Sequence, residues 1–179
     1  MRRDAQADAM RQSGMEAVLY VDAVGEEPRF PVGYDLDEAL KLENQLCFPL
    51  YACSKEMVRR YTPYLDKLGL TYTQYIVLMV LWEEDGITVG DLGDRLLLDS
   101  GTLTPLLKKM ESHGLLCRRR STLDERRVEV SLTQKGRDLK VEAAQVPLAM
   151  AACVQLDPEE AEQLVSLLNK VLENVRNSR

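Results

Sequence analysis

The chain has 179 residues, of which 45% are hydrophobic, so it is long enough for one domain with a core and too apolar for a disordered protein. No apolar run approaches the ~20 residues that span a bilayer, and no apolar signal core follows the N-terminus, so we expect a cytoplasmic protein without a membrane partner. The net charge is −6, but residues 99–137 contain nine Lys and Arg against five Asp and Glu. A basic segment on an acidic body indicates a localised surface that binds phosphate groups.

The cysteine content predicts free thiols. The four cysteines are Cys47, Cys53, Cys117 and Cys153. Their spacing is too wide for a CxxC motif, and a single histidine cannot complete a His-rich metal site, so we expect no metal and no cofactor. Cys53 follows Cys47 by six positions, which turns a helical side chain by ~240° and makes a local disulfide unfavourable. Cys117 leads into a basic segment and is expected to be structural.

The first part of the chain is predicted to be an N-terminal extension followed by helices. Residues 1–34 contain segments typical of a short helix, a strand and a loop with two prolines, and we expect much of this extension to be mobile. From residue 35 onwards, apolar residues recur at helical spacing. Pro49 predicts a kink or a fresh helix start, whereas Pro63 and Gly69 predict a break.

A nearly all-apolar helix is predicted over residues 72–84, where Thr71 and Gln74 form a capping box at its start. A helix that is apolar on all sides is buried, so this one is expected to be a central strut. A short helix capped by Thr88 follows, and then a longer helix that ends at Gly114.

The start of this longer helix can be placed in more than one way. Propensity alone puts Thr104 at the cap and Pro105 at the first helical position. His113 adjoins the glycine that ends the helix, so it is interpreted as a C-terminal cap contact rather than a ligand.

After this helix the pattern changes to the period of two that is typical of strands. Apolar and polar residues alternate over residues 128–132, and a polar turn separates them from an arginine-rich segment, which predicts a basic hairpin. Thr133 starts another helix, which we expect to bend at Pro147. Asp157 and Pro158 start the last helix, with a cap and a proline at its first position.

Two helices followed by a hairpin predict a winged helix-turn-helix, in a fold that is mainly α with a small β hairpin wing. We expect residues 71–133 to bind double-stranded operator DNA. Residues 35–70 are expected to form dimerisation and sensor helices, and residues 134–179 to form C-terminal dimerisation helices. Their apolar stripes exceed what one small domain can cover, so a homodimer is the natural way to bury them.

The second helix of a helix-turn-helix enters the major groove, and arginines of a wing can enter a narrow minor groove. The candidate DNA-binding residues are Ser100, Thr102, Thr104, Lys108, Lys109, Arg118, Arg119, Arg120, Arg126 and Arg127. Small hydroxyl side chains at a helix N-terminus suit phosphate or base-edge contacts. Two alternatives stay open, namely that the hydroxyl side chains only cap the helix and that the arginines form an ordinary solvated hairpin.

Four segments resemble a known family. DERRVEVSLTQKG resembles the wing signature of MarR-type regulators, in which the Asp and Arg that match Asp124 and Arg126 shape the wing and the Arg reaches DNA. LENQLCFPLYACSKEM, LTYTQYIVLMVLWE and LLDSGTLTPLLKKMESHGL resemble the organic hydroperoxide repressors of the OhrR type, and the resemblance covers roughly residues 40–145. It implies a winged-helix repressor whose recognition helix begins near Asp99 or Ser100.

The same resemblance implies a redox site. Cys47 matches the peroxide-reactive cysteine, and Tyr61 and Tyr72 match the tyrosines that hydrogen-bond to that cysteine in the dimer. In two-cysteine members a resolving cysteine of the other subunit lies in the helix after the wing, where this chain has Cys153. Cys153 stands about one residue from the expected position relative to Pro147, and one residue turns a helical side chain by ~100°. One-cysteine and two-cysteine mechanisms therefore both stay open.

These residues favour a repressor that releases its operator when an organic hydroperoxide oxidises Cys47. We therefore do not expect an enzyme. A thiolate attacks the peroxide, hydroxyl donors stabilise that anion, and the sulfenic acid product condenses with a second thiol. Apolar neighbours such as Phe48 favour an organic peroxide. The alternatives are a thiol peroxidase, a MarR-type regulator that responds to an aromatic small molecule, and a structural interaction module.

Overall fold

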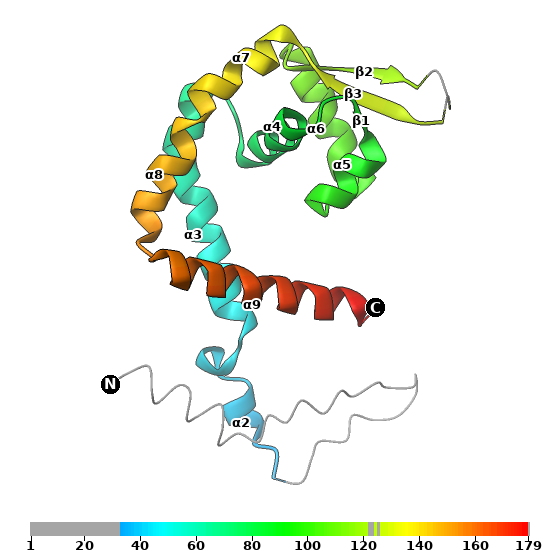
Figure 1. Cartoon of the computed structure of the whole chain (residues 1–179). Helices are drawn as coiled ribbons and strands as arrows, with labels where there is room; N and C mark the ends of the chain where they lie inside the picture. The colour runs from blue at the N-terminus through cyan, green and yellow to red at the C-terminus, as the bar shows by residue number, and fades with distance from the viewer. Residues whose placement is uncertain (1–32, 122–123, 125, 179) are drawn as a thin grey trace. The chain divides into compact units, whose positions relative to one another are not determined.

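The computed structural model describes residues 33–121, 124 and 126–178. In chain order these residues form α2 (Leu36–Ala39), the 3-10 helix η1 (Leu42–Asn44), α3 (Cys47–Leu65), the 3-10 helix η2 (Asp66–Leu68), α4 (Tyr72–Glu83), β1 (Ile87–Thr88), α5 (Val89–Leu96), α6 (Ser100–Ser112), β2 (Leu116–Arg120), β3 (Val128–Leu132), α7 (Gln134–Ala143), α8 (Gln145–Val154) and α9 (Pro158–Asn177) (Figure 1). Most of the predicted N-terminal extension, residues 1–32, lies outside the described residues. The chain divides into two compact units between Glu56 and Met57.

The described part of the first unit, residues 33–56, contains two short helices and the start of a long one. The side chain of Asp35 caps α2 by accepting hydrogen bonds from the backbone N–H groups of Asp37 and Glu38. After η1, α3 begins at Cys47. Pro49 lies in the first turn of α3, where its missing N–H costs no helical hydrogen bond, so the fresh helix start predicted there is confirmed.

The break predicted at Pro63 is wrong, because α3 continues through this residue to Leu65. Pro63 stands two residues from the helix end, so it removes a single backbone donor close to the point where the helix stops. The buried side chain of Leu65 anchors that last turn. The break comes at Gly69, whose φ of 68° ends η2 in the left-handed conformation.

A buried apolar cluster holds the second unit together. Its helix α4 begins with the predicted capping box of Thr71 and Gln74 and has buried residues along its whole length, so the expected central strut is confirmed. The cluster consists of Leu65, Leu70, Tyr75, Val77, Leu78, Val80, Leu81, Ile87, Leu92, Leu103, Leu107, Met110, Leu115, Leu116, Val130, Leu132, Ala143, Val146 and Met150. It joins α4, α6, the sheet and the start of α8 around one core.

Helices α5 and α6 and a small antiparallel sheet form a winged helix-turn-helix, as predicted (Figure 1). Strands β2 and β3 pair in a hairpin whose register places Leu116 opposite Leu132. The sheet has a third strand, β1, which pairs with β3 and gives the order β1-β3-β2. The sequence analysis missed β1 because two residues are too few to show a period of two.

Three helices follow the wing. The predicted bend is present, since the chain leaves α7 at Ala144 and continues in α8 with Pro147 in its first turn. Asp157 caps α9 in a capping box with Glu160, as its sequence indicates. Large apolar side chains remain exposed on α8 and α9, namely Leu148, Val154, Leu164, Val165, Leu167, Leu168, Leu172 and Val175. Across the described residues, no helix combines the length and apolar character needed to cross a membrane.

Candidate nucleic-acid interface and thiol sites

The cap at Asp99 determines where α6 begins. Its carboxylate accepts hydrogen bonds from the backbone N–H of Thr102 at 2.9 Å and from the Thr102 hydroxyl at 3.0 Å, and these bonds hold the pKa of Asp99 below its ordinary value. The helix therefore starts at Ser100, and the start at Pro105 that propensity favoured is wrong. Pro105 lies inside α6, because the cap and the buried Leu103 fix the turn before it.

Helix α6 has one buried face and one exposed polar face. The buried residues are Leu103, Leu107 and Met110, and the exposed candidates for DNA contact are Ser100, Thr102, Thr104, Lys108 and Lys109. The Thr102 hydroxyl already donates to the cap, which supports the capping interpretation for this residue. His113 is the C-cap residue of α6, next to Gly114 in the left-handed conformation.

The wing presents a group of exposed arginines. They are Arg119 and Arg120 on β2, and Arg126 and Arg127 after the turn. Within the described residues, no ion pair includes any of these four. Their guanidinium groups are therefore available to an anion from outside the chain.

Arg118 differs from the other wing arginines because Glu111 of α6 binds it. The Glu111 carboxylate accepts hydrogen bonds from the Arg118 backbone N–H at 2.9 Å, from Nε at 3.1 Å and from Nη2 at 2.7 Å. These hydrogen bonds hold the pKa of Glu111 below its ordinary value. The pair fixes the base of the wing to the recognition helix.

Asp124 organises the end of the wing turn. Its carboxylate accepts a hydrogen bond from the backbone N–H of Arg126 at 3.0 Å, and its carbonyl accepts one from the N–H of Arg127 at 2.9 Å. The carbonyl of Arg127 in turn accepts a hydrogen bond from the N–H of Ser121. This geometry supports the wing-shaping role that the family resemblance implies for Asp124.

The four cysteines are free thiols. Cys47 is the first residue of α3 and is exposed, as is Cys53 further along the same helix. Cys117 is half-buried on β2, and Cys153 is exposed near the end of α8. Among the described residues, no cluster of His, Cys, Asp and Glu side chains could hold a metal ion.

Tyr61 and Tyr72, which the resemblance pairs with the reactive cysteine, lie together in the second unit. Their ring centroids are 5.0 Å apart at an interplanar angle of 63°, and Tyr75 lies 6.0 Å from Tyr61. Burial, and then the neighbouring Tyr72, raise the pKa of Tyr61. Its hydroxyl therefore stays protonated at neutral pH and can donate a hydrogen bond.

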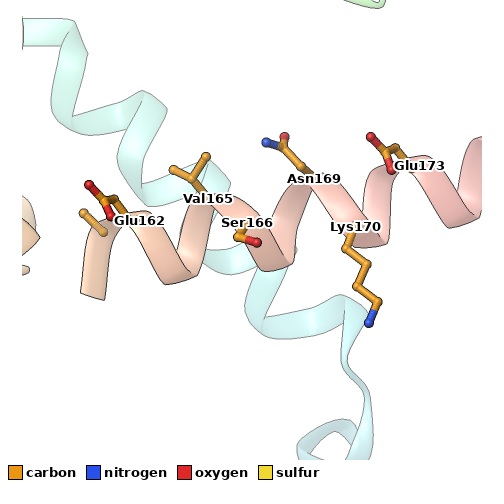
Figure 2. Close-up of a pocket in the computed structure, with 7 residues that line it drawn as sticks. Glu162, Val165, Ser166, Asn169, Lys170 and Glu173 are labelled. Atoms are coloured by element: carbon orange, nitrogen blue, oxygen red, sulfur yellow. The ribbon is translucent and has the colours of Figure 1, made fainter. Parts of the chain in front are cut away.

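The described residues also line hollows on the surface of the second unit. A small apolar one of about 220 Å³ lies between α4 and the α7–α8 segment, and is lined by Tyr75, Met79, Trp82, Glu83, Lys140, Ala143, Ala144 and Pro147. A larger one of about 690 Å³ runs along α9, and Figure 2 shows side chains such as Glu162, Asn169 and Lys170 beside it. All residues that line this larger hollow belong to α9, so it is a stretch of helix surface and not an enclosed ligand site.

A capped recognition helix beside an arginine-rich wing defines a winged-helix transcriptional regulator. Residues 59–143 match the family described as Transcriptional regulator SarA/Rot. Over 136 residues the chain is 50% identical to the organic hydroperoxide resistance transcriptional regulator of Bacillus subtilis, an alignment that covers 76% of this chain and 92% of that protein. The chain belongs to the MarR-type winged-helix regulators, in the OhrR-type branch of organic hydroperoxide resistance.

Solved structures agree with this assignment. The structure of reduced AbfR bound to DNA has a TM-score of 0.65 and 35% identity, and covers 78% of this chain and 96% of that one. AbfR is a Staphylococcus epidermidis protein that is also solved in a disulfide-formed state. That structure has a TM-score of 0.55 and 36% identity, and covers 76% of this chain and 96% of that one.

Several residues that join the elements around the wing could not be identified from the sequence. Glu111 gave no local signal, because its partner lies seven positions away across a turn. Asp85 and Gly136 were missed because their partners are remote in the sequence. Pairings of this kind depend on the tertiary fold and leave no periodic pattern in the chain.

Proposed function

We propose that the protein is a homodimeric repressor that releases its operator when an organic hydroperoxide oxidises Cys47. The central observation is that Cys47 is an exposed free thiol at the first position of α3, in a chain of the hydroperoxide regulator family. The species that attacks a peroxide is the thiolate, and an exposed thiol is open to the oxidant. As a regulator that meets chromosomal DNA, the protein acts in the cytoplasm.

The DNA-binding half of the proposal rests on residues 71–133. In this arrangement α6 enters the major groove, where Ser100, Thr104, Lys108 and Lys109 face the duplex. Arg119, Arg120, Arg126 and Arg127 contact phosphates or the minor groove through the wing. Two recognition helices of a dimer then occupy successive major grooves about 34 Å apart.

The dimer half rests on the exposed apolar side chains of residues 35–70 and 134–179. Leu148 is 68% exposed and Leu167 is 61% exposed in the single chain. Contiguous apolar surface of this kind marks a protein interface, and a two-fold interface between identical chains buries both copies at once.

The thiol and the two tyrosines meet only between subunits in this proposal. Tyr61 and Tyr72 of one subunit act on Cys47 of the other, where their hydroxyls stabilise the thiolate.

The reaction consumes one peroxide per thiol. The Cys47 thiolate attacks the terminal peroxide oxygen, an S–O bond forms, the O–O bond breaks, and the organic part leaves as an alcohol after taking up a proton. In the one-cysteine mechanism the sulfenic acid is the final product, whereas in the two-cysteine mechanism it condenses with the thiol of Cys153 from the other subunit, which forms a disulfide and releases water. Either product changes the packing of the dimer and displaces the recognition helices.

Operator binding of the full-length protein with and without tert-butyl hydroperoxide tests the proposal. We expect peroxide to release wild-type protein and the Cys53→Ser control, but not the Cys47→Ser variant. The Cys153→Ser variant distinguishes the two mechanisms. If peroxide still releases the operator from this variant, the mechanism requires only Cys47. Release of Cys47→Ser by peroxide would contradict the sensor role.

Two other functions make different predictions. A thiol peroxidase consumes many equivalents of hydroperoxide per chain, whereas a sensor consumes about one or two. The apolar hollow beside Tyr75 and Trp82 supports the second alternative, a regulator that responds to an aromatic small molecule. In that case an aromatic ligand releases the operator equally from wild-type protein and from Cys47→Ser.

A further inference from the structure

The first turn of α7 is bound to the end of α4 through Asp85. The Asp85 carboxylate accepts a hydrogen bond from the backbone N–H of Leu132 at 2.7 Å through Oδ1, and forms an ion pair with Arg137 at 2.7 Å through Oδ2. Leu132 is the last residue of β3, and Arg137 lies in α7. The carboxylate of Asp85 therefore binds both the end of β3 and the first part of α7.

A second set of contacts lies further along the same side of α7. The indole Nε1 of Trp82 donates to the carbonyl of Gly136 at 2.9 Å, and Nζ of Lys140 donates to the carbonyl of Trp82 at 3.1 Å. These bonds join residues 54 and 58 positions apart. Helix α7 is thus attached to α4 over about one turn, from Gly136 to Lys140.

A third set joins α7 to the end of the recognition helix. The Thr133 hydroxyl donates to the carbonyl of Gly114 at 2.6 Å, and Nζ of Lys135 donates to the carbonyl of His113 at 3.0 Å. Gly136 packs so closely on the carbonyl oxygen of Leu115 that a Cβ at this position would overlap it. The hydrogen bonds described here therefore join the start of α7 to α4 and to the segments that follow α4 and α6.

We propose that Asp85 and Arg137 are positioning residues that couple the orientation of α7 to the wing and the recognition helix. This inference rests on the proposed redox function. Helix α7 continues into α8, which contains Cys153 and the exposed Leu148. A change in the packing of α8 after oxidation turns α7, and the bound start of α7 moves the recognition helix with it.

Because the ion pair between Asp85 and Arg137 is partly exposed, its effect on coupling can be distinguished from its effect on stability. The side chains of Arg137 and Asp85 are 49% and 33% exposed, and ion pairs at such exposure add little to global stability. Loss of the pair is therefore expected to change the transmission of a movement more than it changes Tm.

The test measures the ratio of operator affinities of reduced and tert-butyl hydroperoxide-treated full-length protein. We expect R137Q to shrink this ratio by about tenfold, within the usual range of allosteric couplings, because the treated variant stays bound more tightly. D85N keeps an acceptor for the N–H of Leu132 but loses the ion pair, so it should shrink the affinity ratio as much as R137Q does. The double variant should shrink the ratio no further than either single variant. The matched control is R95Q, which breaks the exposed ion pairs of Arg95 with Glu83 and Glu84 and leaves α7 untouched.

Two further measurements distinguish a loss of coupling from slower oxidation of Cys47 and from lower stability. The rate of Cys47 oxidation, followed by thiol titration, should equal the wild-type rate in R137Q and D85N, and their Tm should match that of R95Q. A ratio in R137Q that equals those of wild type and R95Q overturns the inference, as does an additive effect in the double variant. If peroxide does not release the wild-type protein, the proposed function itself fails.

Discussion

The carboxylate of Glu111 accepts three hydrogen bonds from Arg118, one from its backbone N–H and two from its guanidinium group. Glu111 lies on α6 and Arg118 on β2, so this pair joins the recognition helix to the wing. In the function proposed above, Arg118 therefore has a positioning role and the other wing arginines are the candidates for DNA contact.

The Glu111→Gln variant should lower the free energy of unfolding by about 1 kcal/mol at neutral pH, a value reduced for the partial exposure of the pair. Since the pKa of Glu111 is held below its ordinary value of 4.5, its contribution is complete above that pH and is lost as the pH falls through the lowered pKa. Urea denaturation measured from pH 7 to pH 3 should show that the free energies of unfolding of wild type and Glu111→Gln converge as the pH falls. Glu142→Gln, at an exposed position of α7, serves as the control, and a stability difference between Glu111→Gln and wild type that grows in acid would refute the assignment.

The Gly136→Ala variant should destabilise the protein by roughly 1–3 kcal/mol, because the added Cβ overlaps the carbonyl oxygen of Leu115. The matched change is Gly90→Ala in α5, where the nearest atom, Thr88 Oγ1, is 3.6 Å from the added Cβ. That variant should be neutral or stabilised by up to about 1 kcal/mol, since alanine is the better helix former. Thermal unfolding compares the two, and equal effects would show that the close approach does not matter.

The Arg126→Ala variant should bind the operator roughly tenfold more weakly and should reduce the slope of log K against log salt by about one. The physical reason is the loss of one guanidinium that displaces counterions from the duplex. Fluorescence anisotropy at several salt concentrations measures both quantities. Arg176→Ala, which removes an arginine from the end of α9, should change neither, and an unchanged slope in Arg126→Ala would exclude this residue from the interface.

The Tyr61→Phe variant should slow oxidation of Cys47 by roughly tenfold, the worth of one hydrogen bond to a charged group. Because the pKa of Tyr61 is raised by burial, its hydroxyl is a donor throughout the neutral range. Stopped-flow thiol consumption measures the rate, while operator affinity of the reduced variant should be unchanged. Tyr64→Phe on the same helix is the control, and equal rates in all three proteins would argue against the tyrosine contact.

The sequence by itself determined the features that depend on near neighbours. The capping box of Thr71 and Gln74, the cap of α5 at Thr88 and the proline start of α9 involve residues at most three positions apart, so their hydrogen bonds follow from local chemistry. The hairpin followed from the alternation of apolar and polar residues over residues 128–132. Together these signals were sufficient for the winged-helix fold.

Only the tertiary structure decided the features that join remote segments. Pro105 lies inside α6 although propensity placed it at a helix start, because the cap at Asp99 outweighs one lost backbone donor. The bond of Asp85 to Arg137 joins residues 52 positions apart, and no periodic pattern marks such a pair. Local propensity specifies which segments form helices and strands, but the angle between them depends on contacts that exist only after the chain has folded.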